Sequence, residues 1–295
     1  MIIVKIQGGL GNQMFEYALA KYLEAAGKDV KLYLGHYSDS YKGSEDAIHN
    51  GYELQRIFTP TIPIATKKEV LHYARVNRDF LSRSLNKILG PKKFHIRQED
   101  LDKKHCYFPQ FKNLENAYLD GYWNSFLYAE KVRNSIMKEF AFKNELSERN
   151  AMVAKHIKDT ISVSLHIRHG DYLKLQDRYA IPTIRYYTSA IIYFQKHFRN
   201  VRFFCFSDDI EWCKKHIDIT NIEFIDWNTG ADSYVDMQLM SLCKHNIIAN
   251  STFSMWAAWL NTYKDKIVIR PESVFVDVEN EKIDMWPKNW ISLKN

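Results

Sequence analysis

The second half of the chain alternates between short apolar segments and longer segments with apolar residues at helical spacing. A regular alternation of this kind is typical of a doubly wound sheet, in which helices connect parallel strands and cover both faces. We therefore predict an α/β fold. The expected strands are 161–168, 201–206, 222–225, 246–249 and 267–270, and the expected helices are 185–198, 210–216, 233–244 and 253–261.

The first residues repeat this pattern around a glycine-rich turn. An apolar strand at 2–6 leads through the turn 8–11 into a helix from about residue 12 to 26. Counting from Gly9, the third glycine of the G-x-G-x-x-G dinucleotide motif would fall on a methionine, and no P-loop motif is present. We expect instead that Gly9 and Gly11 let the backbone approach a ligand between two lobes.

The chain, with 295 residues, is long enough for two domains. We expect an N-terminal α/β domain of residues 1–155 and a C-terminal Rossmann-like domain of residues 156–295, with a cleft between them. The region 35–115 is irregular, and the tail around Trp286 is a candidate for packing back on the first lobe. Further strands are expected at 30–34 and 118–123, and further helices at 67–84 and 126–140.

Composition and charge narrow the classes of protein. Hydrophobic residues make up 46% and charged residues 26%, as in an ordinary folded protein, and the formal charge of +6 favours anionic partners. No basic stripe accompanies the aromatic residues, so a nucleic-acid partner is the least favoured. The four cysteines lack C-x-x-C spacing, and neither a secretory signal nor a bilayer-length apolar run is present. These features predict a cytoplasmic protein with reduced thiols, with peripheral attachment to the inner membrane as an alternative.

A run of small polar residues stands between the expected strand 246–249 and the expected helix 253–261. Such a turn points backbone N–H groups, the positive end of a helix dipole and several hydroxyls at one place, which can hold a phosphate without metal. The alternative is that the first two residues only cap a buried helix. The run comprises Asn250, Ser251, Thr252, Phe253 and Ser254.

Charged residues also follow the expected strand 161–168. Because ligands bind beyond the carboxyl ends of the strands in an open parallel sheet, Arg168 is placed to grip a phosphate with two parallel hydrogen bonds. The alternative is a solvated charge at a strand end. The hydroxyl turn further along the chain favours the phosphate.

Three segments together resemble the signature blocks of glycosyltransferase family 11, the bacterial and animal α-1,2-fucosyltransferases. They are 8–15 (GGLGNQMF), 166–172 (HIRHGDY) and 250–254 (NSTFS), with 206–209 (FSDD) and 121–123 (GYW) in the same pattern. The resemblance covers nearly the whole chain in the right order. It implies a GT-B-like fold, in which the C-terminal lobe binds GDP-fucose and the N-terminal lobe faces a galactose-terminated oligosaccharide acceptor. It also implies inversion at the fucose anomeric carbon without a metal or another cofactor.

The resemblance also implies roles for single residues in donor binding. Arg168 would contact the diphosphate, His166 would lie near the nucleoside, and Asp236 would accept hydrogen bonds from guanine. The 250–254 turn would bind phosphate through hydroxyls and amides. For Asp236 the alternative is an ordinary acidic residue at a helix N-terminus.

Asp208 and Asp209 at the end of the expected strand 201–206 have two explanations. They could hold a ribose or orient Arg168, or they could cap the helix that follows.

The acceptor hydroxyl must lose a proton, and a nearby carboxylate or imidazole could accept it. The candidates are Asp171, His169 and Glu16, and Asp171 has the alternative role of orienting Arg168. A loose transition state without a base is also compatible with the sequence. The family pattern often has Gln at the position of Glu16 and usually has Arg at that of His169, so we expect donor affinity to depend on pH more than in relatives.

Two further motifs have competing explanations. Asn12, which follows the glycine loop, is either a hydrogen-bonding contact from the first lobe or the N-cap of the first helix. The D-x-D motif of metal-dependent transferases occurs at Asp100 and Asp102, in a polar stretch without a preceding strand. We interpret it as surface and predict activity without metal.

Two rival functions remain open from the sequence. One is a transferase that uses another nucleotide sugar. The other is a non-catalytic carbohydrate-binding protein in which residues such as Trp123, Trp227 and Trp256 stack on sugars. Binding of GDP discriminates against the second, because a lectin has no use for a nucleotide pocket.

Overall fold

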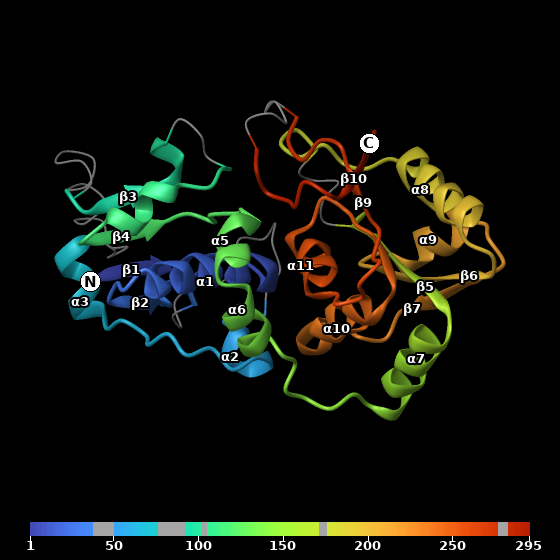
Figure 1. The fold of residues 1–295 in the computed structure, drawn as a ribbon, viewed down its shortest axis with the longest axis horizontal. Coiled ribbons are helices and arrows are strands. Elements are labelled where there is room, and N and C mark those ends of the chain that lie inside the picture. The colour runs from blue at the N-terminus through green and yellow to red at the C-terminus, as the bar shows by residue number, and fades with distance from the viewer. Residues whose placement is uncertain (38–49, 76–91, 102–104, 171–175, 277–282) are drawn as a thin grey trace. The chain divides into compact units, whose positions relative to one another are not determined.

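A computed structural model describes residues 1–37, 50–75, 92–101, 105–170, 176–276 and 283–295 (Figure 1). The chain divides into two compact units. Unit 1 comprises the described residues of 1–43, 51–141 and 282–285, and unit 2 comprises those of 44–50, 142–281 and 286–295. Each unit has its own parallel β-sheet with helices packed against it, so the fold is the α/β, GT-B-like class.

Unit 1 contains a four-stranded parallel sheet of order β2-β1-β4-β3. Ile2 of β1 pairs with Val30 of β2 and with Ala117 of β4, so the carboxyl ends of the strands meet at one edge. The strands are β1 (Ile2–Lys5), β2 (Val30–Tyr33), β3 (His95–Arg97) and β4 (Ala117–Asp120). The helices are α1 (Leu10–Ala25), α2 (Leu54–Ile57), α3 (Lys67–Tyr73), α5 (Phe126–Lys131) and α6 (Arg133–Glu139), with the 3-10 turns η1 (Gly35–Tyr37), η2 (Gln98–Asp100) and η3 (Pro109–Asn113).

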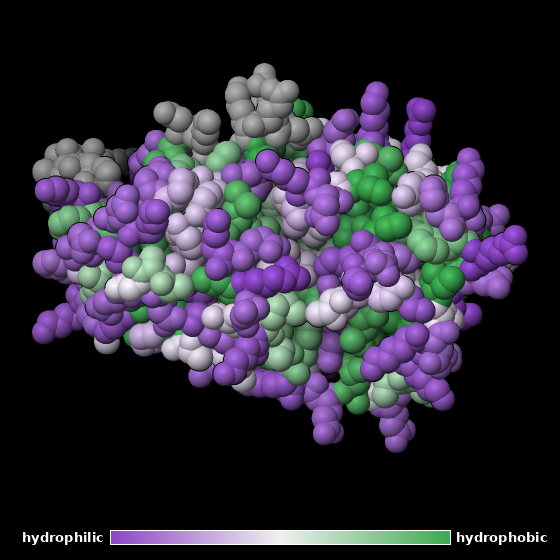
Figure 2. Space-filling view, viewed as in Figure 1, coloured by the Kyte–Doolittle hydropathy of each residue, from purple (hydrophilic) through white to green (hydrophobic). Residues whose placement is uncertain are grey.

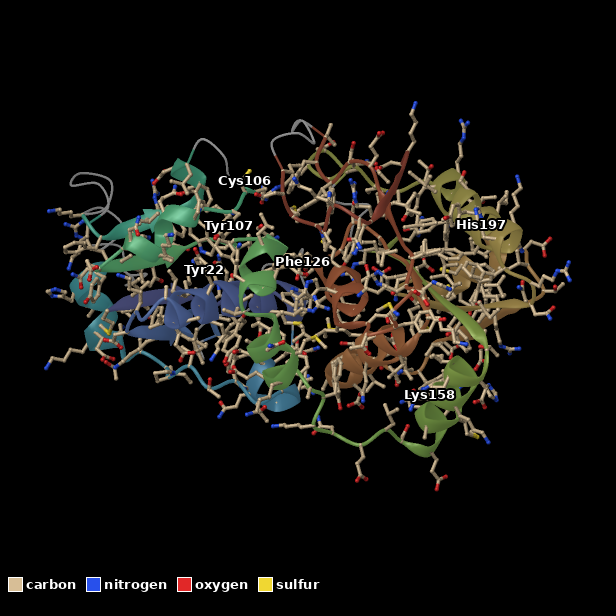
Figure 3. All side chains as sticks on the ribbon, in the orientation of Figure 1. Tyr22, Cys106, Tyr107, Phe126, Lys158 and His197 are labelled. Carbon is tan, nitrogen blue, oxygen red and sulfur yellow. The ribbon has the colours of Figure 1, made fainter. Side chains whose placement is uncertain are left out.

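Helix α1 is the core element of unit 1. Between Leu10 and Leu23 every residue except Asn12 is buried, including the polar side chains of Gln13, Glu16 and Lys21. The rings of Phe15 and Phe126 lie 4.6 Å apart, which packs α1 on α5. The Tyr22 and Tyr107 hydroxyls, 2.9 Å apart, satisfy each other within the same aromatic cluster (Figure 3).

Unit 2 contains a six-stranded parallel sheet of order β10-β9-β8-β5-β6-β7. Its strands are β5 (Ile161–Ile167), β6 (Val201–Ser207), β7 (Ile222–Ile225), β8 (His245–Ile247), β9 (Val268–Pro271) and β10 (Ile291–Leu293). Its helices are α7 (Glu148–Asp159), α8 (Ile184–His197), α9 (Ile210–His216), α10 (Tyr234–Leu242) and α11 (Thr252–Leu260), with the 3-10 turn η5 (Gly230–Asp232).

Strand β5 lies in the interior of the unit 2 sheet. Val163, Leu165 and Ile167 are buried in one apolar cluster with residues of α8 and the neighbouring strands. The hydroxyl of Tyr186 on α8 donates to the backbone oxygens of Ile248, at 2.7 Å, and Ile269. Helix and sheet are therefore held in one register by apolar packing and a buried hydrogen bond.

The strand and helix pattern predicted over 161–270 is confirmed, with ends that differ by a few residues. The expected helix 126–140 is instead two helices, because Val132 leaves helical dihedral angles (φ −126°, ψ 32°) between α5 and α6. Part of the expected helix 67–84 lies outside the described residues, and the rest is α3. The sequence did not predict α7, whose buried face is short and interrupted by polar residues.

The C-terminal tail belongs mainly to unit 2. Trp286 and the residues after it are grouped with that unit, where β10 extends the sheet by pairing with β9. The preceding residues Ile283 to Met285 are grouped with unit 1, where the Asp284 backbone oxygen accepts a hydrogen bond from Ser125.

The surface has the mixed character expected from the composition. Hydrophilic residues are spread over the face shown in Figure 2, with apolar residues scattered among them. Within the described part of the chain, no helix is both long and apolar enough to cross a membrane.

Candidate active site

The functional candidates of unit 2 gather where parallel strands end. In the register of β5 with β6, His166 faces Phe206 and Ile167 faces Ser207. On the other side of β5, Leu165 faces Ile247 of β8, the strand that leads to the hydroxyl turn. The segments that follow β5, β6 and β8 therefore leave the sheet at the same edge.

Arg168 is held at this edge by an ion pair. Its Nε lies 3.3 Å from Oδ2 of Asp208, and the Arg168 side chain is 28% exposed. Asp208 also accepts a hydrogen bond of 2.9 Å from the His169 backbone amide. Burial would raise the pKa of Asp208, but the Arg168 charge and the backbone amides of 169 and 170 outweigh it and lower that pKa. Asp208 is thus a carboxylate that orients Arg168, as one of the two sequence interpretations holds.

His169 forms a hydrogen-bonded pair with a second aspartate beside the first. Its Nδ1 lies 2.9 Å from Asp209 Oδ2, and its ring stacks on Trp212 with centroids 4.2 Å apart. Asp209 is also the N-cap of α9 and accepts from the Trp212 backbone amide at 3.1 Å. The hydrogen bonds from His169 and Trp212 lower the pKa of Asp209. Asp209 therefore caps α9, in agreement with one of the two interpretations of the sequence, and its other carboxylate oxygen pairs with His169 rather than with Arg168.

His166 is buried under this edge, with 5% of its surface exposed. Burial, and then the nearby Arg168 charge, lower the pKa of His166 to about 3, so the imidazole is neutral at physiological pH. Its Nδ1 has no hydrogen-bond partner among the described residues. The ring lies 6.0 Å from that of Phe253, centroid to centroid, which connects the β5 end with the hydroxyl turn.

The hydroxyl turn leaves the N-terminus of α11 open. Ser251 occupies the N-cap position, but its side chain makes no capping hydrogen bond, and the first turn contains no acidic residue. The helix dipole and the first N–H groups are therefore available to an anion. The explanation that Asn250 and Ser251 only cap the helix is wrong, because neither side chain performs that role.

Two residues of the turn make side-chain hydrogen bonds to backbone atoms. Asn250 Nδ2 donates to the backbone oxygens of Ala180 and Ser273, so its amide anchors two loops. Ser254 is fully buried, and its hydroxyl bonds the backbone of Ala249 and Ser251 within the turn. Of the predicted phosphate ligands, Thr252 and Phe253 are partly exposed.

Asp236 lies in a separate cluster of unit 2. It is in the first turn of α10 and its Oδ1 accepts a 2.8 Å hydrogen bond from Asn228. Asn150 of α7 bonds Asn228 and also accepts from the Trp227 indole at 2.9 Å. Burial, partly offset by the Asn228 hydrogen bond, raises the pKa of Asp236 to about 7. The structure thus places a carboxyl with a pKa of about 7 on α10.

The unit 1 candidates surround the glycine loop. Gly8 has a left-handed φ of 71°, and a Cβ there would lie 2.8 Å from the Asn12 amide nitrogen, so glycine is required. Gly9 is the N-cap of α1, with open space where a Cβ would be, and Gly11 is buried in the first turn. The alternative explanation of Asn12 as the N-cap is therefore wrong, because the helix begins two residues earlier than the sequence suggested.

Gln13 ties this loop to its surroundings. Its side chain is fully buried, and its Nε2 donates to the backbone oxygens of Gly8 at 3.0 Å and Gly51 at 2.8 Å. Its Oε1 accepts from the backbone amide of Glu53 at 2.9 Å. The sequence analysis missed this role, although a glutamine in a buried helix is itself an unusual signal.

Glu16 is fully buried, and its Oε2 accepts a hydrogen bond of 2.9 Å from the Gln7 backbone amide. Burial raises the pKa of Glu16 well above its ordinary value, although the Gln7 hydrogen bond and the Lys5 charge act in the opposite direction. A carboxyl without exposed surface cannot reach the hydroxyl of an acceptor. The structure therefore removes Glu16 from the candidate bases.

Three acidic residues remain among the candidates from the sequence. Asp171 lies outside the described residues. Asp100 is 46% exposed and paired with Arg97 at 2.7 Å, as expected for a surface residue, and Asp102 lies outside the described part of the chain. The described ranges contain no group of three or more His, Cys, Asp or Glu side chains that could hold a metal ion.

A cavity of about 330 Å³ adjoins Arg168 and His169 within unit 2. The loop that precedes α8, the first residues of α8 and Trp212 line it. This cavity could not be predicted from the sequence. The residues that line it come from segments that are far apart in the chain and carry no shared pattern.

Comparison with known proteins places these features in a family. A model described as "Glycosyl transferase family 11" matches residues 1–294. An "Alpha-1,2-colitosyltransferase" of Escherichia coli is 32% identical over 312 residues, covering 100% of this chain and 99% of that protein. A "Galactoside alpha-(1,2)-fucosyltransferase 2" of Pongo pygmaeus is 24% identical, covering 86% of this chain and 67% of that protein. Among solved structures, the fucosyltransferase NodZ from Bradyrhizobium has a TM-score of 0.51 at 15% identity, covering 88% of this chain and 91% of that one, and it shares the fold.

Proposed function

Since the chain belongs to glycosyltransferase family 11, we propose that it transfers L-fucose from GDP-β-L-fucose to the 2-hydroxyl of a terminal β-galactoside. The product would carry an α-1,2 linkage, formed with inversion at the anomeric carbon. A transferase that uses GDP-colitose is the second candidate, because the colitosyltransferase relative matches the chain over its whole length. Colitose is the 3-deoxy form of L-fucose, so the two candidates differ by one hydroxyl of the donor.

One observation carries the proposal: Arg168, fixed by Asp208 at 3.3 Å, follows a strand whose neighbour leads into the uncapped N-terminus of α11. A guanidinium and a helix N-terminus are both suited to a diphosphate. As the bond from fucose C1 to the β-phosphate oxygen breaks, negative charge grows on that phosphate. Groups fixed there before the reaction stabilise the transition state more than the ground state.

The acceptor oxygen attacks C1 from the opposite face, forms the new bond and releases its proton. Among the candidate bases in the described residues, the geometry favours His169. Its Nδ1 is held by Asp209, which leaves Nε2 as the nitrogen for proton transfer. The proton then passes to solvent. In this proposal the His169–Asp209 pair takes the role that the sequence offered to three residues.

Asp236 is proposed to read the guanine base. Its carboxylate can accept from both the ring N1–H and the exocyclic amine, and Asn228 fixes its orientation through Oδ1. No metal ion or cofactor is part of the proposed reaction, because Arg168 and the α11 N-terminus supply the positive charge at the leaving group.

The test is transfer from GDP-fucose and from GDP-colitose to lactose, in the presence of excess chelator. We expect an α-1,2-linked product, identified by nuclear magnetic resonance, from at least one donor, at the same rate without chelator. Inactivity with both donors across a panel of β-galactosides would contradict the proposed function. A strict requirement for a divalent cation would contradict the metal-independent mechanism alone.

A further inference from the structure

The cavity beside Arg168 has room for a small ligand. Its volume of about 330 Å³ is at the lower end of the range for small-molecule sites, which suits a monosaccharide better than a whole nucleotide sugar. It is built by a single unit, from the end of β5 to the first turns of α8. The site described above uses Arg168 and His169 of this cavity, and its other walls have no assigned role.

Part of the cavity lining consists of apolar side chains that are exposed to solvent. Ile184 is 38% exposed and Val276 is 54% exposed, and both line the cavity together with the half-buried Ile181. Single exposed apolar side chains are ordinary, but apolar side chains that converge on one concave site indicate a ligand with an apolar part.

The cavity lining also offers hydrogen-bond donors. Thr183, the N-cap of the 14-residue helix α8, makes no side-chain capping bond, and the first turn of that helix has no acidic residue. The Tyr187 side chain is 1% exposed, and its hydroxyl, which the Arg168 backbone amide approaches, has no acceptor for its own proton in the described part of the chain. Burial raises the pKa of Tyr187, so the hydroxyl keeps its proton and can donate it. A buried donor without an acceptor is costly unless a ligand satisfies it.

We propose that this cavity holds the sugar of the donor and reads its methyl group, which restricts the enzyme to nucleotide-linked 6-deoxyhexoses. The inference rests on the proposed function, because the sugar is bonded to the phosphate that Arg168 would bind. Arg168 itself lines the cavity, so the sugar of a donor held there lies within reach of these walls. The C6 methyl packs against Ile184 and Val276, while ring hydroxyls accept from Tyr187 and the α8 N-terminus.

A hexose with a hydroxyl at C6 fits this cavity poorly. Its extra hydroxyl would lose water against the side chains of Ile184 and Val276 without gaining a partner. GDP-L-galactose is the suitable probe, because it differs from GDP-L-fucose only by that hydroxyl.

The experiment measures kcat/KM for GDP-fucose and GDP-L-galactose with one acceptor. We expect the wild-type enzyme to prefer GDP-fucose by about 10- to 100-fold, the usual discrimination of an apolar pocket against an added hydroxyl. Ile184→Ser should reduce this preference at least about threefold. The matched control is Ile192→Ser, on the same helix and 41% exposed but outside the cavity, which should keep the wild-type ratio.

Tyr187→Phe tests the Tyr187 hydroxyl as a hydrogen-bond donor to the sugar. Loss of the hydroxyl should lower kcat/KM about 2- to 10-fold for both donors and leave their ratio unchanged. An unaltered kcat/KM for both donors would overturn the role of Tyr187.

The outcomes separate this inference from the proposed function. Equal use of the two donors by the wild-type enzyme, or an unchanged ratio in Ile184→Ser, would overturn the methyl-reading cavity while the transferase function stands. Inactivity with both GDP-fucose and GDP-colitose would instead overturn the function on which the inference rests.

Discussion

The polar side chains at the carboxyl edges of the two parallel sheets have different kinds of partners. In unit 1, Lys5 pairs with Asp120 at 2.7 Å, His95 lies 3.3 Å from the same carboxylate, and buried Gln13 makes three hydrogen bonds to backbone. In unit 2, Arg168 and His169 are each held by one aspartate at the rim of a cavity.

The helix N-termini of unit 2 add to the difference. Neither α8 nor α11 has a side-chain cap or an acidic residue in its first turn, so both contribute positive dipole ends beside Arg168. The unit 1 edge is closed by hydrogen bonds between its own groups, whereas the unit 2 edge keeps donors for a ligand. We therefore assign the anionic donor to unit 2, and expect substitutions at the two edges to have different consequences.

The largest effect is expected for Arg168→Ala. Removing a fixed donor to the developing phosphate charge should lower kcat about 100- to 1000-fold while the far-ultraviolet circular dichroism stays unchanged. Arg199→Ala, which removes an exposed arginine of the same unit outside the site, is the control and should retain full turnover. Half of wild-type turnover in Arg168→Ala would refute the assignment.

The counterpart in unit 1 is Gln13→Ala. This change removes three hydrogen bonds to backbone and leaves the buried Glu53 amide without its acceptor, although the Gly8 oxygen keeps the Tyr37 hydroxyl as a donor. It should lower the free energy of unfolding by about 1 to 3 kcal/mol. Affinity for GDP should not change if GDP binds to unit 2 as proposed. Urea denaturation and calorimetry measure the two quantities, with exposed Gln55→Ala as control. A large loss of GDP affinity without loss of stability would contradict a purely structural role of Gln13 and the assignment of GDP binding to unit 2.

Asp236 predicts a pH dependence of the nucleotide affinity. Its pKa of about 7 means that the carboxylate, which is proposed to accept from guanine, is present above neutrality and is lost as the pH falls. The affinity for GDP should therefore be about tenfold lower at pH 6 than at pH 8. Asp236→Asn should bind GDP more weakly at pH 8 and lose this dependence. The same pH slope in both proteins would show that another group is responsible.

The smallest effect is expected for Glu16→Gln. Glu16 is fully buried and burial raises its pKa, so a neutral amide of the same shape should change kcat by less than about twofold. Steady-state kinetics with a saturating acceptor measure it. A loss of 100-fold or more would restore Glu16 as a catalytic base.

The edge of the unit 2 sheet could be predicted from the sequence, because the residues that define it directly follow the strands in the chain. The alternation of strands and helices fixes where β5, β6 and β8 end, and chemistry-bearing residues follow each of them. An aspartate of the 208–209 pair beside Arg168 was therefore one of the expected arrangements, and the structure has Asp208 there, whereas the pairing of His169 with Asp209 was not predicted.

The remaining features depend on packing between distant segments. Whether Glu16 is exposed, whether Gln13 reaches Gly51, and how Asn150 meets Asn228 are decided by tertiary contacts that leave no periodic signal. The start of α1 at Leu10 was missed because its N-cap is Gly9 rather than a residue with a capping side chain. The cavity beside α8 was likewise not visible in any motif.

The most direct test is a calorimetric titration of the wild-type protein with GDP and with guanosine in excess chelator. If the unit 2 edge holds the diphosphate, GDP should bind one to one and at least about tenfold more tightly than guanosine, and Arg168→Ala should remove most of that difference. Equal affinities for GDP and guanosine, or a difference that survives in Arg168→Ala, would contradict the account.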